Sequence, residues 1–233
     1  MTLLKYILSI IFSLCLVLLI ILVAVQLPMF NLGFYSGEYD KYGIPESIGV
    51  SKEDLLAVTR HMVDYMRGKE ENLQINVAVW GAERGFFNER ELLHMDDVKL
   101  LVLGGLGLRN RALALLLAAG AALALLARKE RGAYLVCCRV ARLTSLIVTA
   151  AAAVLIFLFA WNFNAGFTMF HKIFFSNDLW ILDPRTDLLI QIVPLPFFID
   201  ISIAIAAIYI IGVACVILAS CLYIAKKRVH KPV

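Results

Sequence analysis

The sequence predicts an α-helical integral membrane protein with four transmembrane helices, a small extracytoplasmic cap and both termini in the cytoplasm. Apolar residues make up 61% of the 233 residues and charged residues only 17%, whereas a soluble domain is about half apolar and about a quarter charged. The apolar residues also lie in long runs, which excludes a soluble globular protein and a disordered one.

Four apolar runs predict the membrane spans. The first, residues 6–27, carries no charge and reaches about 33 Å as a helix, enough to cross about 30 Å of hydrocarbon. A cleaved signal peptide is the alternative, but its apolar region would be shorter and would end in small residues at a cleavage site. We assign transmembrane helices to residues 1–27, 112–127, 143–161 and 197–225.

The distribution of charge predicts the orientation. The segment 128–142 carries five basic residues and one acid, and the tail 226–233 carries four basic residues and no acid. Residues 28–98 instead carry seven basic residues and thirteen acids. Because basic loops stay in the cytoplasm, we expect 128–142 and 226–233 there. An extracytoplasmic cap and interfacial segment (28–111) and an aromatic, histidine-containing loop (162–196) would face outward.

Charge and cysteine content exclude several function classes. The net charge of +4 is not gathered into a dense basic stripe, so nucleic acid is not an expected partner. None of the five cysteines lies in the outward segments, so neither a disulfide framework nor an outward thiol nucleophile is expected. The chain has no nucleophile elbow, P-loop or HExxH zinc motif. Acid–base chemistry remains possible at the outer face.

The first outward segment is predicted to contain an amphipathic helix and a short extended stretch. Ser51 is a candidate N-cap, and apolar residues then recur at helical spacing as far as Met66. Residues 73–80 favour an extended conformation. These elements are expected to form a small cap that is marginal as an independent domain.

A second helix of this segment carries a histidine between two acids. Asn88 can cap it, with Glu91 three residues later completing a capping box. His94 then shares a face with Glu91 and Asp97, which lie three residues before and after it. A carboxylate beside an imidazole can hold its tautomer and raise its pKa. The alternative is a capped surface helix whose charges are solvated.

Glycines follow this helix before the second span. Gly104, Gly105 and Gly107 are expected to break the helix, so that residues 98–108 lie along the membrane surface. Their spacing does not match a dinucleotide fingerprint. Such a break would keep His94 near the lipid headgroups.

The second outward segment places aromatic residues around another histidine. Those at helical spacings of one, three and four from His171 are Phe167, Phe170, Phe174 and Phe175. An aromatic belt at the membrane interface explains some of them. It does not explain the polar Asn177, Asp178 and Asp183, because polar groups in apolar surroundings are costly and tend to be functional.

Two of the four histidines lie at matching places. His94 precedes the second span and His171 follows the third, so they could converge, whereas His61 and His230 are expected to be inert. One imidazole could take a proton from a nucleophile while the other stabilises the oxygen that becomes charged. If the substrate supplies the nucleophile, acyl transfer between two groups of one lipid-anchored molecule fits this chemistry.

Three motifs along the outward segments support a resemblance to a known family. They are Phe34-Tyr35…Tyr39-x-Lys41-Tyr42-Gly43, Glu91-x-x-His94-Met95-x-Asp97-Val98-Lys99 and Phe170-His171-x-x-Phe174-Phe175-x-Asn177-Asp178-x-Trp180-x-x-Asp183-Pro184-x-x-Asp187-x-Leu189-Ile190. Together they resemble the bacterial family of lipoprotein intramolecular transacylases, Lit, over nearly the whole chain.

The resemblance implies a reaction and a location. The substrate would be a diacylglyceryl lipoprotein with a free N-terminal cysteine amine, and the sn-2 acyl chain would move to that amine to give a lyso-form lipoprotein. His94 and His171 would be catalytic, without an acyl-enzyme, a metal or an organic cofactor. The protein would lie in the bacterial plasma membrane among lipids, with its active site facing outside. The oligomeric state stays open, a monomer being the simpler expectation.

The remaining candidates support the reaction or bind the substrate. Asp97 and Asp178 are candidates to orient the imidazoles, with Glu91, Asn177 and Asp183 as further supporting residues. The aromatic wall that would hold acyl chains and exclude competing water consists of Phe167, Phe170, Phe174, Phe175 and Trp180. Candidate pocket residues, for which packing within the cap is the alternative, are Asn31, Tyr35 and Tyr39.

Two other classes of function stay open from the residues. A lipid or lipoprotein ester hydrolase using the same histidines would release free fatty acid instead of forming an amide. A non-enzymatic membrane protein would lose nothing but stability when either histidine is replaced by alanine.

Overall fold

A computed structural model gives the fold and describes all residues except Met1, Arg131 and residues 230–233. The expectation for His230 therefore lies outside the described residues. The chain divides into two compact units. Unit one comprises residues 1–25, 107–166 and 206–233, and unit two comprises residues 26–106 and 167–205.

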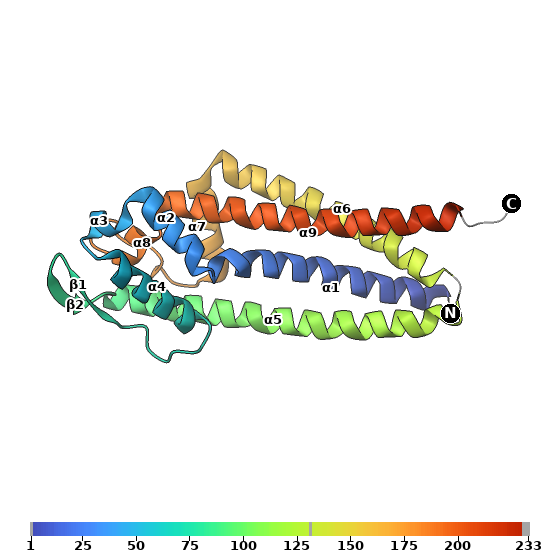
Figure 1. Cartoon of the computed structure of the whole chain (residues 1–233), viewed down its shortest axis with the longest axis horizontal. Coiled ribbons are helices and arrows are strands. Elements are labelled where there is room, and N and C mark those ends of the chain that lie inside the picture. Colours follow the sequence, from blue (N-terminus) through green and yellow to red (C-terminus); the bar gives the residue numbers. More distant parts are fainter. Residues whose placement is uncertain (1, 131, 230–233) are drawn as a thin grey trace. The chain divides into compact units, whose positions relative to one another are not determined.

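Unit one is built from long helices that pack side by side (Figure 1). α1 packs against α9 at Gly212, where a Cβ would come within 2.8 Å of Ile20, so only glycine allows this approach. α6 is joined to α9 by a hydrogen bond of 3.0 Å between the hydroxyls of Thr149 and Tyr209. The helices that contribute to this unit are α1 (Thr2–Met29), α5 (Glu89–Ala127), α6 (Ala133–Trp161) and α9 (Leu195–Val229).

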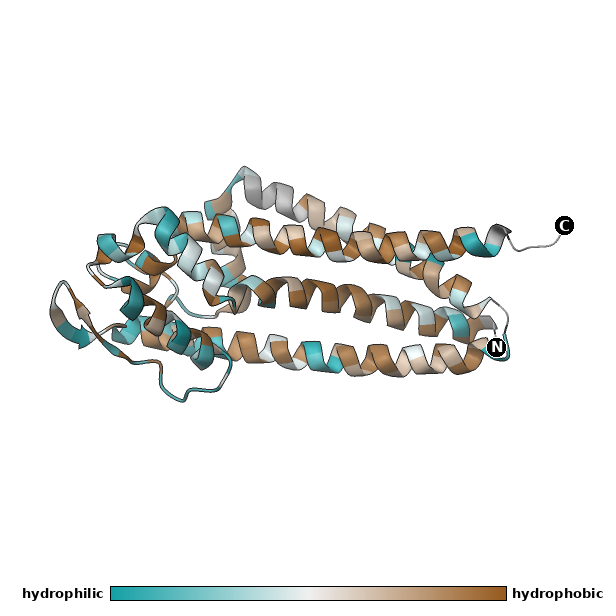
Figure 2. Ribbon diagram, in the orientation of Figure 1, coloured by the Kyte–Doolittle hydropathy of each residue, from teal (hydrophilic) through white to brown (hydrophobic). Residues whose placement is uncertain are grey.

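The prediction of four membrane spans agrees with these helices. In the described part of the chain, four helices are long and apolar enough to cross a membrane, and Figure 2 shows them as mostly brown ribbons. α6 begins at Ala133, ten residues before the predicted span and inside the segment 128–142 that was expected to be a cytoplasmic loop. The side on which each connection lies stays a prediction.

The expected break in α5 is wrong. The helix runs without interruption from Glu89 to Ala127, through Gly104, Gly105 and Gly107. Each glycine costs a helix only about 1 kcal/mol relative to alanine. A break in apolar surroundings would leave backbone N–H and C=O groups unpaired, at several kcal/mol each. The unbroken helix is therefore the more stable arrangement.

Unit two consists of short helices and one hairpin, with the ends of longer helices. Ser51 caps α4 by accepting a hydrogen bond of 3.0 Å from the amide of Asp54, so the predicted start of this helix is confirmed. The predicted extended stretch is confirmed in part, as the first strand of an antiparallel hairpin that pairs Asn76 with Gly85. The elements are α2 (Leu32–Tyr42), α3 (Ile44–Ile48), α4 (Lys52–Met66), β1 (Asn76–Val79), β2 (Ala82–Gly85), α7 (Phe163–Phe174) and α8 (Leu188–Ile192).

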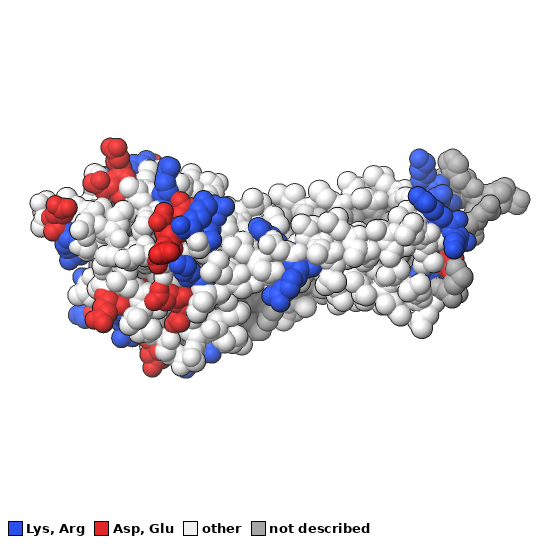
Figure 3. All heavy atoms as spheres, turned by 90° about the horizontal axis from the view of Figure 1, so that it is seen from below, with Lys and Arg blue, Asp and Glu red and all other residues white. Residues whose placement is uncertain are grey.

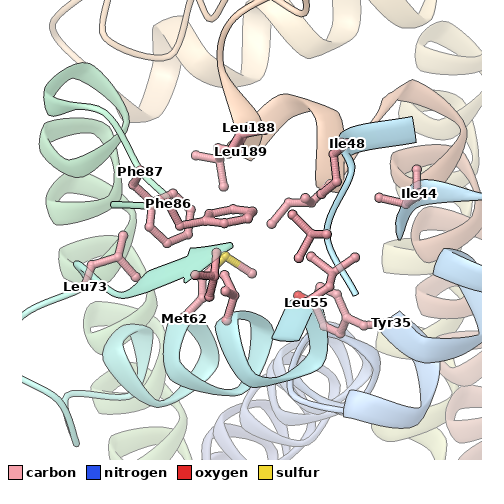
Figure 4. Close-up of a cluster of buried hydrophobic side chains, with 14 of the residues drawn as sticks. Tyr35, Ile44, Ile48, Leu55, Met62, Leu73, Phe86, Phe87, Leu188 and Leu189 are labelled. Carbon is pink, nitrogen blue, oxygen red and sulfur yellow. The ribbon is translucent and has the colours of Figure 1, made fainter. Parts of the chain in front are cut away.

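The hydrophobic core of unit two joins elements that are far apart in the sequence (Figure 4). Leu55 of α4 is fully buried, and Ile48 of α3, Phe86 after the hairpin and Leu189 of α8 are nearly so. Burial of a large apolar side chain contributes about 1.5 to 3 kcal/mol. The core therefore fixes the segment that precedes α5 and the segment around α8 in one unit.

Acidic residues belong almost entirely to unit two. All Asp and Glu residues except Glu130 lie in its sequence ranges. Figure 3 shows the carboxylates gathered on its elements, in contrast to the largely uncharged surface of the long helices. The charge asymmetry on which the predicted orientation depends thus coincides with the division into units.

Candidate active site

His94 lies one turn into α5, where a capping box starts the helix. The amide of Asn88 donates to the Glu91 carboxylate at 2.7 Å, and the amide of Glu91 donates to the Asn88 side chain at 3.0 Å. This reciprocal pair satisfies amides that a helix start leaves unpaired. The predicted capping box is confirmed, and it places His94 on a rigid helix.

His171 lies near the end of α7, and helical geometry determines the tautomer of its imidazole. Its Nδ1 lies 2.7 Å from the carbonyl oxygen of Phe167, one turn earlier. A carbonyl oxygen can only accept, so Nδ1 carries the proton. In the neutral ring Nε2 then has the free lone pair and can act as a base.

The two imidazoles lie close together within unit two. Their ring centroids are 6.2 Å apart, and His94 and His171 are only 7% and 8% exposed. Phe175 touches both, with its ring centroid 5.4 Å from that of His94 and 5.6 Å from that of His171. The predicted convergence of the two histidines is confirmed.

Aromatic residues enclose His171. Trp180 stacks on its ring at 4.7 Å and an angle of 27°, and the Phe167 ring centroid lies 4.1 Å away. Phe170 lies 5.3 Å from it and in turn contacts Phe174 at 4.8 Å. The structure therefore brings together all five residues of the predicted aromatic wall.

One further aromatic residue was not anticipated. Phe198, at the start of α9, lies 5.5 Å from Phe167 and extends the enclosure. In the sequence it belongs to the apolar run of the fourth predicted span, where an aromatic residue has no feature that distinguishes a site residue from a lipid-facing one.

Both imidazoles are neutral at pH 7. Burial lowers the pKa of His94 to about 4, with a further lowering by the neighbouring His171. Burial also lowers the pKa of His171. Asp97 raises the pKa of His94, as was expected of a flanking carboxylate, but by less than burial lowers it, so the net shift is downward.

The two residues expected to orient the imidazoles make other contacts, Asp97 through its carboxylate and Asp178 through its main chain. Asp97 accepts a hydrogen bond of 2.8 Å from the side chain of Asn177. The main-chain carbonyl of Asp178 accepts from the guanidinium of Arg90. Among the described residues, Nδ1 of His94 is buried without a hydrogen-bond partner. The orienting role stays a prediction without a direct contact.

Glu91 instead joins α5 to α8. Its side chain is 1% exposed, and its Oε1 accepts from the amide of Leu189 at 2.6 Å. Burial raises the pKa of this carboxyl. Beside it the Asn88 amide group donates to Asp187 at 2.9 Å. The start of α5 thus fixes the segment that follows Trp180.

The remaining candidates make contacts within the core of unit two and its helix ends. Tyr35 and Tyr39 are buried in the core. The hydroxyl of Tyr35 donates to the Met29 carbonyl at 3.1 Å. The hydroxyl of Tyr39 shares a hydrogen bond of 2.8 Å with that of Thr59. Asn31 caps α2 by accepting from the amide of Gly33. These positions favour packing within unit two, the alternative considered from the sequence.

Asp183 likewise has partners within its own turn. It forms an ion pair of 2.7 Å with Arg185, which is largely exposed. Its amide donates to the Asp187 carboxylate at 2.7 Å. These contacts hold it in the turn before α8.

The pair can perform acid–base chemistry without ionisation in the resting state. Nε2 of His171 can accept a proton, while a neutral His94 can donate a hydrogen bond to an oxygen that becomes charged. Within the described residues no group of three His, Cys, Asp or Glu side chains is placed to hold a metal ion.

The lowered pKa of His94 predicts a pH dependence of stability. In the unfolded chain the ring titrates near 6.5, in the folded protein at about 4. Its contribution to stability is therefore fully present above pH 6.5 and is lost as the pH falls towards 4, because the unfolded state binds the proton first. From pH 6.5 to 4, we expect the unfolding free energy to fall by up to about 3 kcal/mol more in the wild type than in His94→Gln.

Chemical denaturation in detergent at a series of pH values measures this difference. His61→Gln, which removes an imidazole on α4 outside the site, should retain the wild-type slope. Equal slopes for the wild type and His94→Gln would contradict the prediction.

Comparisons with known proteins agree on one family. The family model for the lipoprotein intramolecular transacylase Lit matches residues 10–198. The structure of Lit from Bacillus cereus superposes with a TM-score of 0.79 at 20% identity, covering 99% of this chain and 100% of that one. Two variants of that protein, in which a histidine is replaced by arginine or alanine, give TM-scores of 0.73 and 0.72 at 19% and 20% identity. The first covers 97% of this chain and 95% of its own, the second 97% and 96%. No curated protein sequence matches.

Proposed function

The chain belongs to the family of lipoprotein intramolecular transacylases, Lit, and from this premise we propose which bond it breaks and which residues act. The sn-2 acyl chain of a diacylglyceryl lipoprotein moves to the α-amine of the N-terminal cysteine. One N–C bond forms, the sn-2 ester C–O bond breaks, and one proton passes from the amine to the glyceryl oxygen. The closely placed imidazoles of His94 and His171 are the observation that carries this proposal.

His171 acts as the base. The hydrogen bond from its Nδ1 to the Phe167 carbonyl leaves Nε2 free to take the proton of the attacking amine, and both ring nitrogens can donate once the ring is charged. The same ring then returns the proton to the sn-2 oxygen as the ester bond breaks. The substrate supplies the nucleophile, so no acyl-enzyme forms.

His94 stabilises the oxyanion. Its pKa of about 4 keeps the ring neutral at pH 7. A neutral imidazole can donate a hydrogen bond to the carbonyl oxygen as negative charge develops there, without losing its own proton. The low pKa makes His94 a weaker base than an ordinary histidine, which favours this division of roles.

The aromatic enclosure favours transfer over hydrolysis. Trp180, Phe167 and Phe175 cover the imidazoles with apolar surface, which limits the access of water to the same ester. The amine and the ester belong to one substrate molecule, so orientation is the main contribution that the site can make.

α7 also offers a surface for the acyl chains. Met169, Ile173 and Phe174 are each more than half exposed, on the helix that carries His171. Apolar side chains in such positions suit contact with acyl chains in the outer leaflet. With the acidic segments outward and the basic connections cytoplasmic, the protein lies in the bacterial plasma membrane and unit two faces outside.

Mass spectrometry of a lipoprotein's N-terminal lipopeptide tests the proposal. The chain is expressed in a bacterium that lacks its own lipoprotein N-acylation, and the purified protein is given a diacylglyceryl lipopeptide with an isotopic label in the sn-2 chain. The expected product is an N-acylated, S-monoacylglyceryl peptide with the label on the amide. Labelled free fatty acid would indicate a hydrolase, and an unchanged peptide with well-folded protein would remove the proposed activity.

A further inference from the structure

Arg90 connects α5 to the loop that carries Trp180. Its Nε donates to the carbonyl oxygen of Ile181 at 3.1 Å, and its Nη2 donates to the carbonyl oxygen of Asp178. These carbonyls lie on either side of Trp180 in the chain. Because both acceptors belong to the main chain, Arg90 fixes the path of the loop backbone whatever its side chains are.

The loop in turn determines the position of the Trp180 ring. The indole N–H donates to the carbonyl of Asn177 at 3.0 Å, and the Asn177 side chain accepts from the amide of Leu179 at the same distance. Asn177 also donates to Asp97. The loop is therefore attached to α5 one turn before His94, by Arg90, and one turn after it, by Asp97.

Trp180 passes this constraint to His171. The indole stacks on the imidazole at 4.7 Å and 27°. Apart from the ring of His94, the other described contacts of His171 come from its own helix or the residue just after it. The hydrogen bond to Phe167 restrains only one edge of the ring. The stacked indole limits its rotation and its distance from α5.

We infer that Arg90 is a positioning residue that, through the loop and Trp180, sets the geometry between the imidazoles of His94 and His171. The expected effect of Arg90 on acyl transfer rests on the proposed function. The expected effect of Arg90 on the position of Trp180 is independent of that function. A displacement of about 1 Å in a catalytic group can cost about 100-fold in rate.

Charge is the competing explanation for any effect of Arg90. Its guanidinium lies near enough to disfavour protonation of His94. Lysine distinguishes the two explanations, since an ammonium group keeps the charge but lacks the planar fork that reaches two carbonyls. If the charge of Arg90 matters, Arg90→Lys should therefore behave like the wild type. If its position matters, Arg90→Lys should behave like Arg90→Gln.

The experiment compares five variants in purified full-length protein: Arg90→Lys, Arg90→Gln, Arg185→Gln, Trp180→Ala, and Arg90→Gln combined with Trp180→Ala. Arg90→Lys and Arg90→Gln are both expected to lower the rate of acyl transfer about 10- to 100-fold. Arg185→Gln is the matched control, because Arg185 lies in the same segment and pairs with the nearby Asp183. The transfer rate of this variant should stay within twofold of the wild type. In a Trp180→Ala background, Arg90→Gln should cause no further loss, since residues that act through one contact are not additive.

Tryptophan emission gives a readout that needs no activity. Trp80→Phe and Trp161→Phe leave Trp180 as the sole tryptophan of the chain. Both Arg90 variants should then shift its emission to longer wavelength as the indole leaves the imidazole and meets water, while Arg185→Gln should not. If Arg90→Gln does not accumulate as folded protein, the transfer rate and the Trp180 emission are both measured on Arg90→Lys.

Three results would overturn the inference. These are a wild-type transfer rate in Arg90→Lys, an unchanged Trp180 emission in folded Arg90 variants, and multiplicative losses in the Trp180→Ala background. If the wild-type protein transfers no acyl chain, the proposed function fails while the emission comparison still decides the positioning role.

Discussion

The His171→Ala variant is expected to lose about 10²- to 10⁴-fold in the rate of acyl transfer, the usual contribution of a general base. The reason is specific to the ring's environment: Nδ1 is committed to the Phe167 carbonyl, which leaves Nε2 as the free acceptor. Single-turnover assays with the labelled lipopeptide measure the rate, and thermal denaturation confirms that the variant is folded.

Glutamine separates the roles of the two histidines. Its amide can donate a hydrogen bond but is not a base. His94→Gln should therefore retain more activity than His94→Ala, whose loss is about 10²- to 10³-fold for a missing oxyanion donor. His171→Gln should be no better than His171→Ala, while added imidazole should partly restore the alanine variant. The reverse pattern, with glutamine effective only at position 171, would exchange the roles.

The largest loss of stability is expected for Glu91→Ala. This buried carboxylate accepts from the amides of Asn88 and Leu189. Its removal leaves the buried N–H of Leu189 unpaired, at about 1 to 3 kcal/mol, and the partly buried N–H of Asn88 unpaired at a smaller cost. We expect the unfolding free energy to fall by about 2 to 4 kcal/mol. Denaturant titration in detergent measures it.

Two control variants test whether the loss of stability comes from the hydrogen bonds of Glu91. Glu89→Ala removes an exposed carboxylate from the same helical turn, and its effect should stay within about 0.5 kcal/mol. Glu91→Gln keeps one acceptor oxygen and should lie between Glu91→Ala and the wild type. A loss in Glu89→Ala equal to that in Glu91→Ala would show that the effect comes from helix charge and not from the two amides.

Local patterns predicted much of the fold and the central pair of the site. Ser51 and Asn88 cap helices through residues three positions away, so their signals lie within a few residues of sequence. The spans follow from hydropathy, which depends on composition over a window. His94 and His171 could be paired because each lies beside a predicted span and carries aromatic or acidic neighbours.

Contacts between residues that are far apart in the sequence could not be predicted from local patterns. Arg90 binds main-chain carbonyls, and Glu91 binds the amide of Leu189. Every residue has such groups, so these partners leave no mark in the sequence. Tyr39 was a candidate pocket residue because it lies in an aromatic, turn-rich stretch. Only the fold shows that its hydroxyl is used internally, by Thr59.

The order of the segments along the chain has a consequence for biogenesis. Glu91 and Leu189 are 98 residues apart in sequence, and at about 5 to 20 residues per second their syntheses are separated by roughly 5 to 20 s. During that interval the Leu189 amide, one of the two amides that donate to the Glu91 carboxylate, is not yet present. Contacts of such long sequence separation form late. Unit two is therefore completed, and the two imidazoles meet, only after the third helix of unit one has been synthesised.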